Sequence, residues 1–70
     1  MTRIPVISSN VKSVGYDSKT RVLEVEFLNK SVYQYSSVPK TIYSEMLMAQ
    51  SIGKYLNEHV KGIYSYEKIK

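Results

Sequence analysis

Seven tyrosines and ten basic residues are the side chains with the clearest binding chemistry in this chain of 70 residues. Lysine and arginine neutralise phosphate groups, and tyrosine rings stack on nucleobases. With six acidic residues the net charge is +4, and the charges are spread along the chain without a basic run. The composition therefore permits a nucleic-acid surface, although an ordinary solvated surface explains the charge more simply.

Nucleophilic catalysis has few candidate residues, because the chain contains no cysteine and a single histidine. His59 follows Glu58 on a predicted helix, where neighbouring side chains point about 100° apart, so Glu58 cannot orient the imidazole. His59 instead fits the last helical turn, where a cation complements the helix dipole. A tight metal site needs three or four converging ligands, and these two residues are the only close pair. We predict no catalytic residue, no metal and no cofactor, and therefore no enzyme.

Two groups of residues have the chemistry to bind RNA. Tyr33 and Tyr35 share one face of a predicted strand, as base-stacking aromatics do on some RNA-binding sheets. We expect that face to belong to the core, where tyrosine is common when its hydroxyl reaches an edge. The second group combines cations, an amide donor and nearby rings on and after a predicted helix. Its members are Lys54, Tyr55, Asn57, Lys61 and Tyr64.

The elements that position these residues begin with three strands. Leu23, Val25 and Phe27 alternate with Glu24 and Glu26, which predicts a strand with one apolar face and one solvated face. Shorter apolar patterns flank it on both sides. The three predicted strands are Val11–Tyr16, Arg21–Phe27 and Val32–Ser36.

The loop between the second and third strands decides their register. A two-residue loop would mix charged and apolar residues across the pair. A three-residue loop over residues 28–30, with Lys30 in the left-handed conformation, pairs Val25 with Tyr33 and Leu23 with Tyr35. We predict the second register, at a steric cost to Lys30 that glycine would avoid. The predicted structural core residues are Leu23, Val25, Phe27, Tyr33 and Tyr35.

After Pro39 the apolar spacing becomes helical. One helix carries Ile42, Tyr43, Met46 and Leu47 on a single stripe. A second begins at Ser51, a good N-cap, and ends near Gly62. Residues 63–66 are expected to form a short fourth strand or an extended tail. The prediction is one α+β domain over residues 1–70, with residues 1–9 as a lead-in. It consists of a three-stranded antiparallel β-meander with two C-terminal helices packed on one face.

With these elements in place, the chain resembles the KTSC domain, a short module named for its occurrence at the C-terminus of some lysyl-tRNA synthetases. The family also occurs as stand-alone small bacterial or phage proteins. The resemblance spans about Ser8 to Tyr66. It rests on Ser8-Ser9-Asn10, Val14-Gly15-Tyr16-Asp17, Leu23-x-Val25-x-Phe27, Tyr33-Gln34-Tyr35, Val38-Pro39, Tyr43 and Gly53-x-Tyr55-x-Asn57.

Two positions depart from the family pattern: Lys30, where members often have Gly, and Ser65, where many have Pro. The resemblance implies the α+β fold but no established activity. Through the synthetase association it suggests RNA binding.

Two functions therefore stand as alternatives. The first is a non-catalytic RNA-binding module, and the second is a protein-interaction or self-association module that pairs through a sheet edge. A membrane partner is not expected, because no apolar stretch approaches the ~20 residues of a membrane span. The absence of cysteine fits a reducing compartment, so we expect a cytoplasmic protein.

Overall fold

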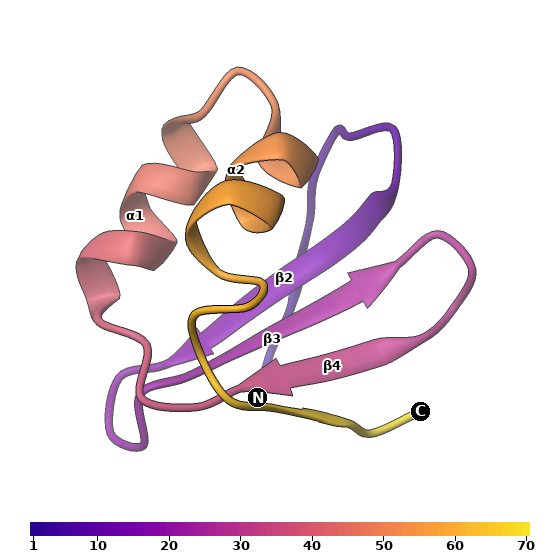
Figure 1. Ribbon diagram of the computed structural model, residues 1–70. Helices are drawn as coiled ribbons and strands as arrows, with labels where there is room; N and C mark the ends of the chain where they lie inside the picture. The colour runs from indigo at the N-terminus through magenta and orange to yellow at the C-terminus, as the bar shows by residue number, and fades with distance from the viewer.

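A five-stranded antiparallel sheet forms the frame of the molecule in the computed structural model, which describes residues 1–70. Its strands lie side by side in chain order. They are β1 (Ile4–Pro5), β2 (Val11–Asp17), β3 (Val22–Phe27), β4 (Val32–Tyr35) and β5 (Tyr66–Lys68). Between β4 and β5 the chain forms α1 (Lys40–Met48) and α2 (Ile52–His59), and both helices lie on the same face of the sheet (Figure 1).

The predicted α+β architecture, a meander followed by two helices on one face, is confirmed. The structure adds strands at both edges. The lead-in contains β1, which pairs with β2 through Ile4 and Pro5. The expected fourth strand is present as β5, but it begins at Tyr66 instead of ending there. Gly62 has a φ of 80°, a conformation that turns the chain after α2, and residues 63–65 then lead back to the sheet.

The predicted register between β3 and β4 is also confirmed. Leu23 lies opposite Tyr35, and Val25 lies opposite Tyr33. The hairpin closes through residues 28–30, and Lys30 has the left-handed φ of 73° that this loop requires. Its backbone N–H donates to the Phe27 carbonyl, 2.9 Å away.

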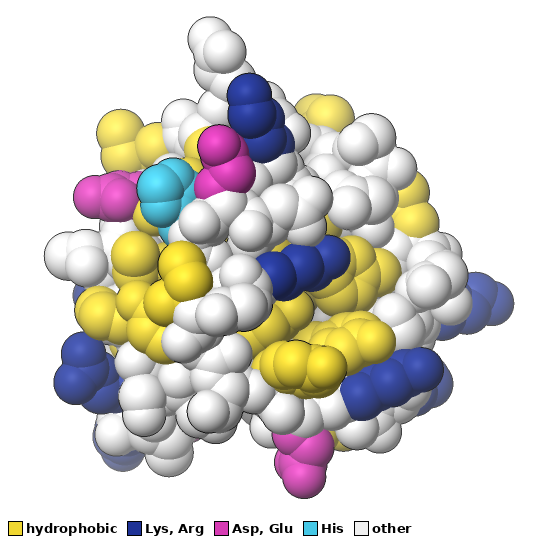
Figure 2. Space-filling view, viewed as in Figure 1, with side chains coloured by type: hydrophobic (Ala, Val, Ile, Leu, Met, Phe, Trp, Pro, Cys, Tyr) yellow, Lys and Arg dark blue, Asp and Glu magenta, His cyan; other side chains and the backbone are white.

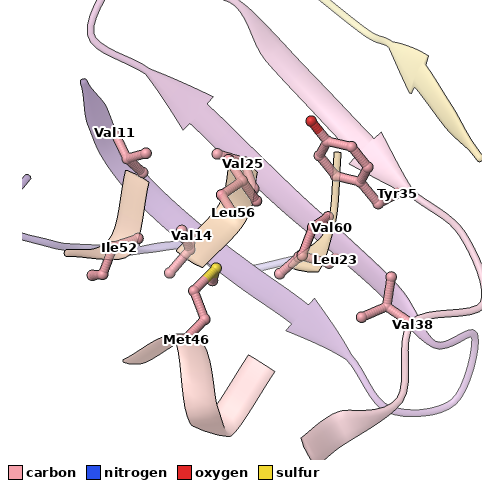
Figure 3. Packing of buried hydrophobic residues seen from close by; sticks show 10 residues of the cluster. All are labelled: Val11, Val14, Leu23, Val25, Tyr35, Val38, Met46, Ile52, Leu56 and Val60. Atoms are coloured by element: carbon pink, nitrogen blue, oxygen red, sulfur yellow. The ribbon is translucent and has the colours of Figure 1, made fainter. Parts of the chain in front are cut away.

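The core lies between the sheet and the two helices, where side chains of the central strands meet those of α1 and α2 (Figure 3). Leu23 and Val25 are fully buried, and Tyr35 is 3% exposed. Phe27 and Tyr33 are only partly buried and pack against the edge of this core, which corrects their assignment as core residues. Phe27 is the last residue of β3 and Tyr33 is the second of β4, so both rings lie beside the β3–β4 hairpin, at the border of the buried cluster.

The helices follow the predicted capping more closely than the predicted burial. The Ser51 side chain accepts a hydrogen bond from the Lys54 N–H at 3.2 Å, as expected of an N-cap. On α1 only Met46 is fully buried, and Leu47 is 37% exposed. Tyr43 instead fixes α1 to the sheet by stacking on Tyr16 of β2, with ring centroids 5.3 Å apart.

The face of the sheet opposite the helices carries an ordered polar row. The Arg3 side chain crosses β2 above Gly15, where a Cβ atom would lie 3.2 Å from Arg3 Cγ and 2.8 Å from the Thr2 carbonyl oxygen. Arg3 then donates a hydrogen bond to Glu24, and Gln34 donates another at 2.7 Å. Glu24 is 8% exposed, so the expectation of a fully solvated charge here was wrong. The N-terminal segment covers this carboxylate because Gly15 gives it room.

Candidate functional site

An open hollow of about 670 Å³ lies where the helices leave the sheet face uncovered. It is bounded by the β3–β4 hairpin, the segment after α2 and the start of β5. Figure 2 shows hydrophobic side chains gathered on this face between α2 and the C-terminal strand, with a Lys or Arg side chain lying across them. The volume is within the range of about 300–1,000 Å³ that is typical of small-molecule sites. We refer to this feature as the aromatic hollow.

Four aromatic residues form its wall and floor. Tyr33 and Tyr35 lie side by side on β4, with ring centroids 6.5 Å apart and planes inclined by 21°. Because Tyr66 pairs with Tyr35 across β4 and β5, its ring joins the same row, 5.6 Å from Tyr33 and 5.9 Å from Tyr35. Phe27 meets Tyr33 edge-on at 5.6 Å. Tyr66 is 63% exposed, so the row presents ring surface to an incoming molecule.

Tyr35 combines a buried ring with a hydroxyl that has no hydrogen-bond partner in the chain. The residue lines the aromatic hollow, and no side-chain oxygen of the structure is both fully buried and unpaired. Its pKa is raised by burial and, to a smaller extent, by the neighbouring Tyr33 and Tyr66 hydroxyls. The hydroxyl is therefore neutral at physiological pH, and it is free to donate or accept a hydrogen bond at the floor of the hollow.

The one charged residue that lines the aromatic hollow is basic. Lys61 Nζ lies 5.0 Å from the centre of the Phe27 ring, a cation–π geometry. Lys68 pairs with Tyr33 across β4 and β5 and so shares the face of the hollow. None of the eleven residues that line the hollow is acidic. An anionic group is therefore favoured there, and a cationic one is not.

Two asparagines add hydrogen-bond donors to the lining. The Asn29 Oδ1 atom accepts bonds from the Ser31 N–H and Oγ at 3.0 and 2.6 Å, which leaves its amide NH₂ free. Asn10 Oδ1 accepts from Ser8 Oγ at 3.2 Å, so its NH₂ is also free. Gly53 of α2 permits the approach of Asn10, because a Cβ there would lie 2.3 Å from Asn10 Oδ1.

The structure separates the residues that we expected to bind RNA. Lys54 and Asn57 are exposed on α2, and Lys61 follows the helix at the rim of the aromatic hollow. Tyr55 and Tyr64 are half-buried and pack against the core. The predicted set is therefore two cations and an amide along one path, with Tyr55 and Tyr64 outside the lining of the hollow.

Tyr55 has a structural environment on the side of α2 that faces α1. Its hydroxyl donates to Glu45 Oε1 at 2.9 Å, and its ring lies 4.4 Å from that of His59. Burial and the bond to Glu45 raise the pKa of Tyr55 to about 12. In the structure no group of three or more His, Asp or Glu side chains converges as a set of metal ligands would.

The sequence reasoning missed Tyr66, Lys68, Asn10 and Asn29. The sequence pattern predicts Tyr66 at the end of a short strand or tail and does not indicate its pairing with Tyr35. The alternation of Tyr66 with Lys68 was the available signal, since residues two apart on a strand share a face. Nothing in the sequence indicates that the loops of Asn10 and Asn29 meet at one hollow.

The free edges of the sheet are short. β1 has two residues, of which one is Pro5, and β5 has three, including Glu67 and Lys68. Short strands, proline and charge are features of edges that do not pair with other chains. Separately, neither of the two helices has the length and apolar character required to cross a bilayer.

Comparison with known proteins gives a consistent set of matches. The family model for the KTSC domain matches residues 7–64. A crystal structure of a KTSC domain protein from Yersinia pestis superposes with a TM-score of 0.95 at 36% identity, and the match covers 99% of this chain and 97% of that one.

Two relatives carry the similar segment in proteins of very different length. An uncharacterised protein of Stutzerimonas stutzeri is 38% identical over 61 residues, covering 87% of this chain and 86% of its own length. A lysine–tRNA ligase of Trichormus variabilis is 39% identical over 61 residues, which cover 87% of this chain but 11% of the ligase. The similar segment is thus nearly the whole of one relative and a small part of the other.

Proposed function

The chain belongs to the KTSC domain family, and from that membership and the geometry of the aromatic hollow we propose that it is an RNA-binding accessory module. It holds single-stranded RNA on the face formed by α2 and the aromatic hollow. Lysines contact phosphates, and tyrosine rings stack on bases.

The observation that carries this proposal is the position of Lys61 beside the row of aromatic rings. Its ammonium group lies over Phe27, and Phe27 in turn contacts Tyr33. A cation next to exposed ring surface matches the two chemical parts of a nucleotide, the phosphate and the base. An ordinary solvated surface does not require the two to be adjacent.

The polar side of α2 extends this site into a path. Lys54 and Asn57 are exposed on the helix, about one turn apart, and Lys61 lies two residues beyond its last residue, His59. This spacing allows successive contacts along a nucleic-acid backbone. The lysines supply charge that is independent of sequence, while the amide of Asn57 is able to read a base edge.

The relatives support RNA as the ligand class. Three matched relatives, from Trichormus variabilis, Nostoc punctiforme and a further Nostoc, are named lysine–tRNA ligases, and each carries the similar segment as 11% of its length. A ligase of that name acts on tRNA, so an accessory segment that holds RNA would serve it. The short, charged sheet edges give self-association through strand pairing less support.

The proposal is tested by measuring the binding of a labelled single-stranded RNA at increasing salt concentration. Binding is expected at low salt, and its logarithm should fall by about 0.7 per phosphate contact for each tenfold increase in salt. In the Lys54→Ala/Lys61→Ala double variant, affinity and salt dependence should both decrease. Lys19→Ala removes the same kind of charge from the β2–β3 turn, at the other end of β3, and serves as the control.

The outcomes separate clearly. Equal affinity of the wild type and the double variant would contradict the path along α2. No binding at low salt, where electrostatic attraction is strongest, would remove the RNA-binding function and leave the protein-interaction module as the alternative.

A further inference from the structure

We propose that the aromatic hollow is a pocket for one unpaired nucleotide, with the base stacked on Tyr66 and Tyr33 and the phosphate at Lys61. This inference rests on the proposed RNA-binding function and goes beyond it, because it assigns a base-binding pocket at the end of the sheet. The sequence placed the contacts on the outer side of α2.

The pocket has a ring surface open to one side only. Tyr66 is 63% exposed, while Tyr35 in the same row is 3% exposed. The four rings lie within 5.6–6.5 Å of their neighbours, so no base fits between them. A base must therefore lie on the outer surface of the row, in the hollow. A duplex keeps its bases stacked on one another, so the proposed ligand is an unpaired residue.

The polar groups of the pocket complement a nucleotide. Lys61 supplies a cation for the phosphate, and no acidic residue lines the hollow to repel it. The amide NH₂ groups of Asn10 and Asn29 donate no hydrogen bond within the chain, whereas their Oδ1 atoms each accept at least one. These donors, with the Tyr35 hydroxyl below, suit the carbonyl oxygens on the edge of a base such as uracil.

The hollow differs in this respect from a surface made for an apolar partner. A hydrophobic peptide leaves free amide donors and a lysine without partners, which costs free energy when they are covered. An anionic, planar ligand that carries carbonyl groups satisfies the lysine, the amide donors and the exposed ring surface at once. The volume of about 670 Å³ is large enough for one nucleotide and falls in the range of small-ligand sites.

The experiment is an NMR titration of the ¹⁵N-labelled protein with uridine 5′-monophosphate, followed by binding of a short oligouridylate. The backbone signals of Asn29, Tyr33, Lys61 and Tyr66 should shift with the mononucleotide. Tyr66→Ala should weaken oligouridylate binding by roughly fivefold or more, and Tyr66→Phe should preserve it, because the ring supplies the stacking. Ile63→Ala removes a side chain of similar exposure, 62%, that does not line the hollow, and should bind as the wild type does.

Three results would overturn the pocket. If oligouridylate binds with the expected salt dependence but Tyr66→Ala and Lys61→Gln bind equally well, the RNA site lies elsewhere and the general function survives without the pocket. If uridine 5′-monophosphate shifts none of these signals and RNA does not bind at low salt, both proposals fail. If the same signals shift on simple dilution of the free protein, the hollow is a self-association surface.

Discussion

Arg3 and Glu24, which are 21 residues apart in the chain, meet on the face of the sheet opposite the helices. An Arg3 Nη1–H donates to Glu24 Oε2 at 2.5 Å, and Gln34 holds the other oxygen of the carboxylate. The Glu24 side chain is 10% exposed and that of Arg3 30%. Arg3 therefore joins the N-terminal segment to the third strand across β2, and it neutralises a charge in the middle of the sheet.

The loss of this contact should lower stability, because Arg3→Ala leaves a buried carboxylate with only one partner. We expect a cost of about 1–3 kcal/mol in the free energy of unfolding. A double-mutant cycle with Glu24→Gln, measured by urea denaturation at neutral pH, isolates the pairwise part of this cost. If the two substitutions add without coupling, the contact contributes nothing to stability.

Acid should destabilise the fold through Glu26, the neighbour of this pair. A hydrogen bond from Ser13, at 2.9 Å, lowers the pKa of Glu26 below its ordinary value of 4.5, with smaller contributions from Lys12 and Arg3. A group with a lowered folded-state pKa stabilises the fold above its unfolded-state pKa, and it loses that effect as pH falls through the folded-state value. The melting temperature should therefore decrease from about pH 5 downward.

Ser13→Ala tests the cause of this pH dependence. Without the hydroxyl, the pKa of Glu26, measured by NMR titration of its carboxyl carbon, should rise towards the ordinary value. Ser44→Ala, an exposed serine on α1, should leave it unchanged. An unaltered pKa in the Ser13 variant would assign the shift to the neighbouring cations instead.

Lys30→Gly should stabilise the hairpin. Lys30 has a φ of 73°, a conformation that costs a side-chain-bearing residue about 1–2 kcal/mol. Glycine removes that strain but gives the unfolded chain more freedom, which offsets about 0.4–1 kcal/mol of the gain. A net increase of about 0.5 kcal/mol should raise the melting temperature by roughly 2–4 °C in a domain of this size.

Lys19→Gly provides the matched control in the β2–β3 turn, because Lys19 does not have a positive φ. It relieves no strain, so it should lower the melting temperature. A decrease for Lys30→Gly of the same size would mean that residue 30 is unstrained.

The hairpin also illustrates how much of the fold the sequence predicts. The register of β3 and β4 followed from sorting Val25 and Tyr33 onto one face, because a slip of one residue would bury charge. The same reasoning could not find β1, whose two residues include Pro5 and show no alternation. It also treated Glu24 as solvated, since the partner that covers it, Arg3, is distant in the chain.

The candidate site was less accessible from sequence. Lys61 was identified from its helical spacing, but its position over Phe27 depends on where α2 ends. Tyr55 has a ring and a hydroxyl that are suited to binding RNA. In the folded chain, however, the packing of α1 against α2 brings Glu45 to that hydroxyl, which donates a hydrogen bond to it. Local patterns report which face a residue occupies, whereas the hollow arises from loops and termini that meet only in the folded chain.

Tyr35 and Tyr66, the two tyrosines compared in the last prediction, should differ in how much each contributes to the stability of the fold. Tyr35→Ala should lower the free energy of unfolding by about 3 kcal/mol or more, because its ring belongs to the buried cluster and truncation leaves a cavity in the core. Tyr35→Phe should cost little, since the hydroxyl has no partner in the chain. Tyr66→Ala should change stability by less than about 1 kcal/mol, because that ring is mostly exposed. Urea denaturation followed by circular dichroism measures all three variants. A stable Tyr35→Ala variant would place the Tyr35 ring outside the core and make it a candidate for stacking on a base. Strong destabilisation by Tyr66→Ala would mean that β5 depends on the Tyr66 ring, and the binding test would then use Tyr66→Leu.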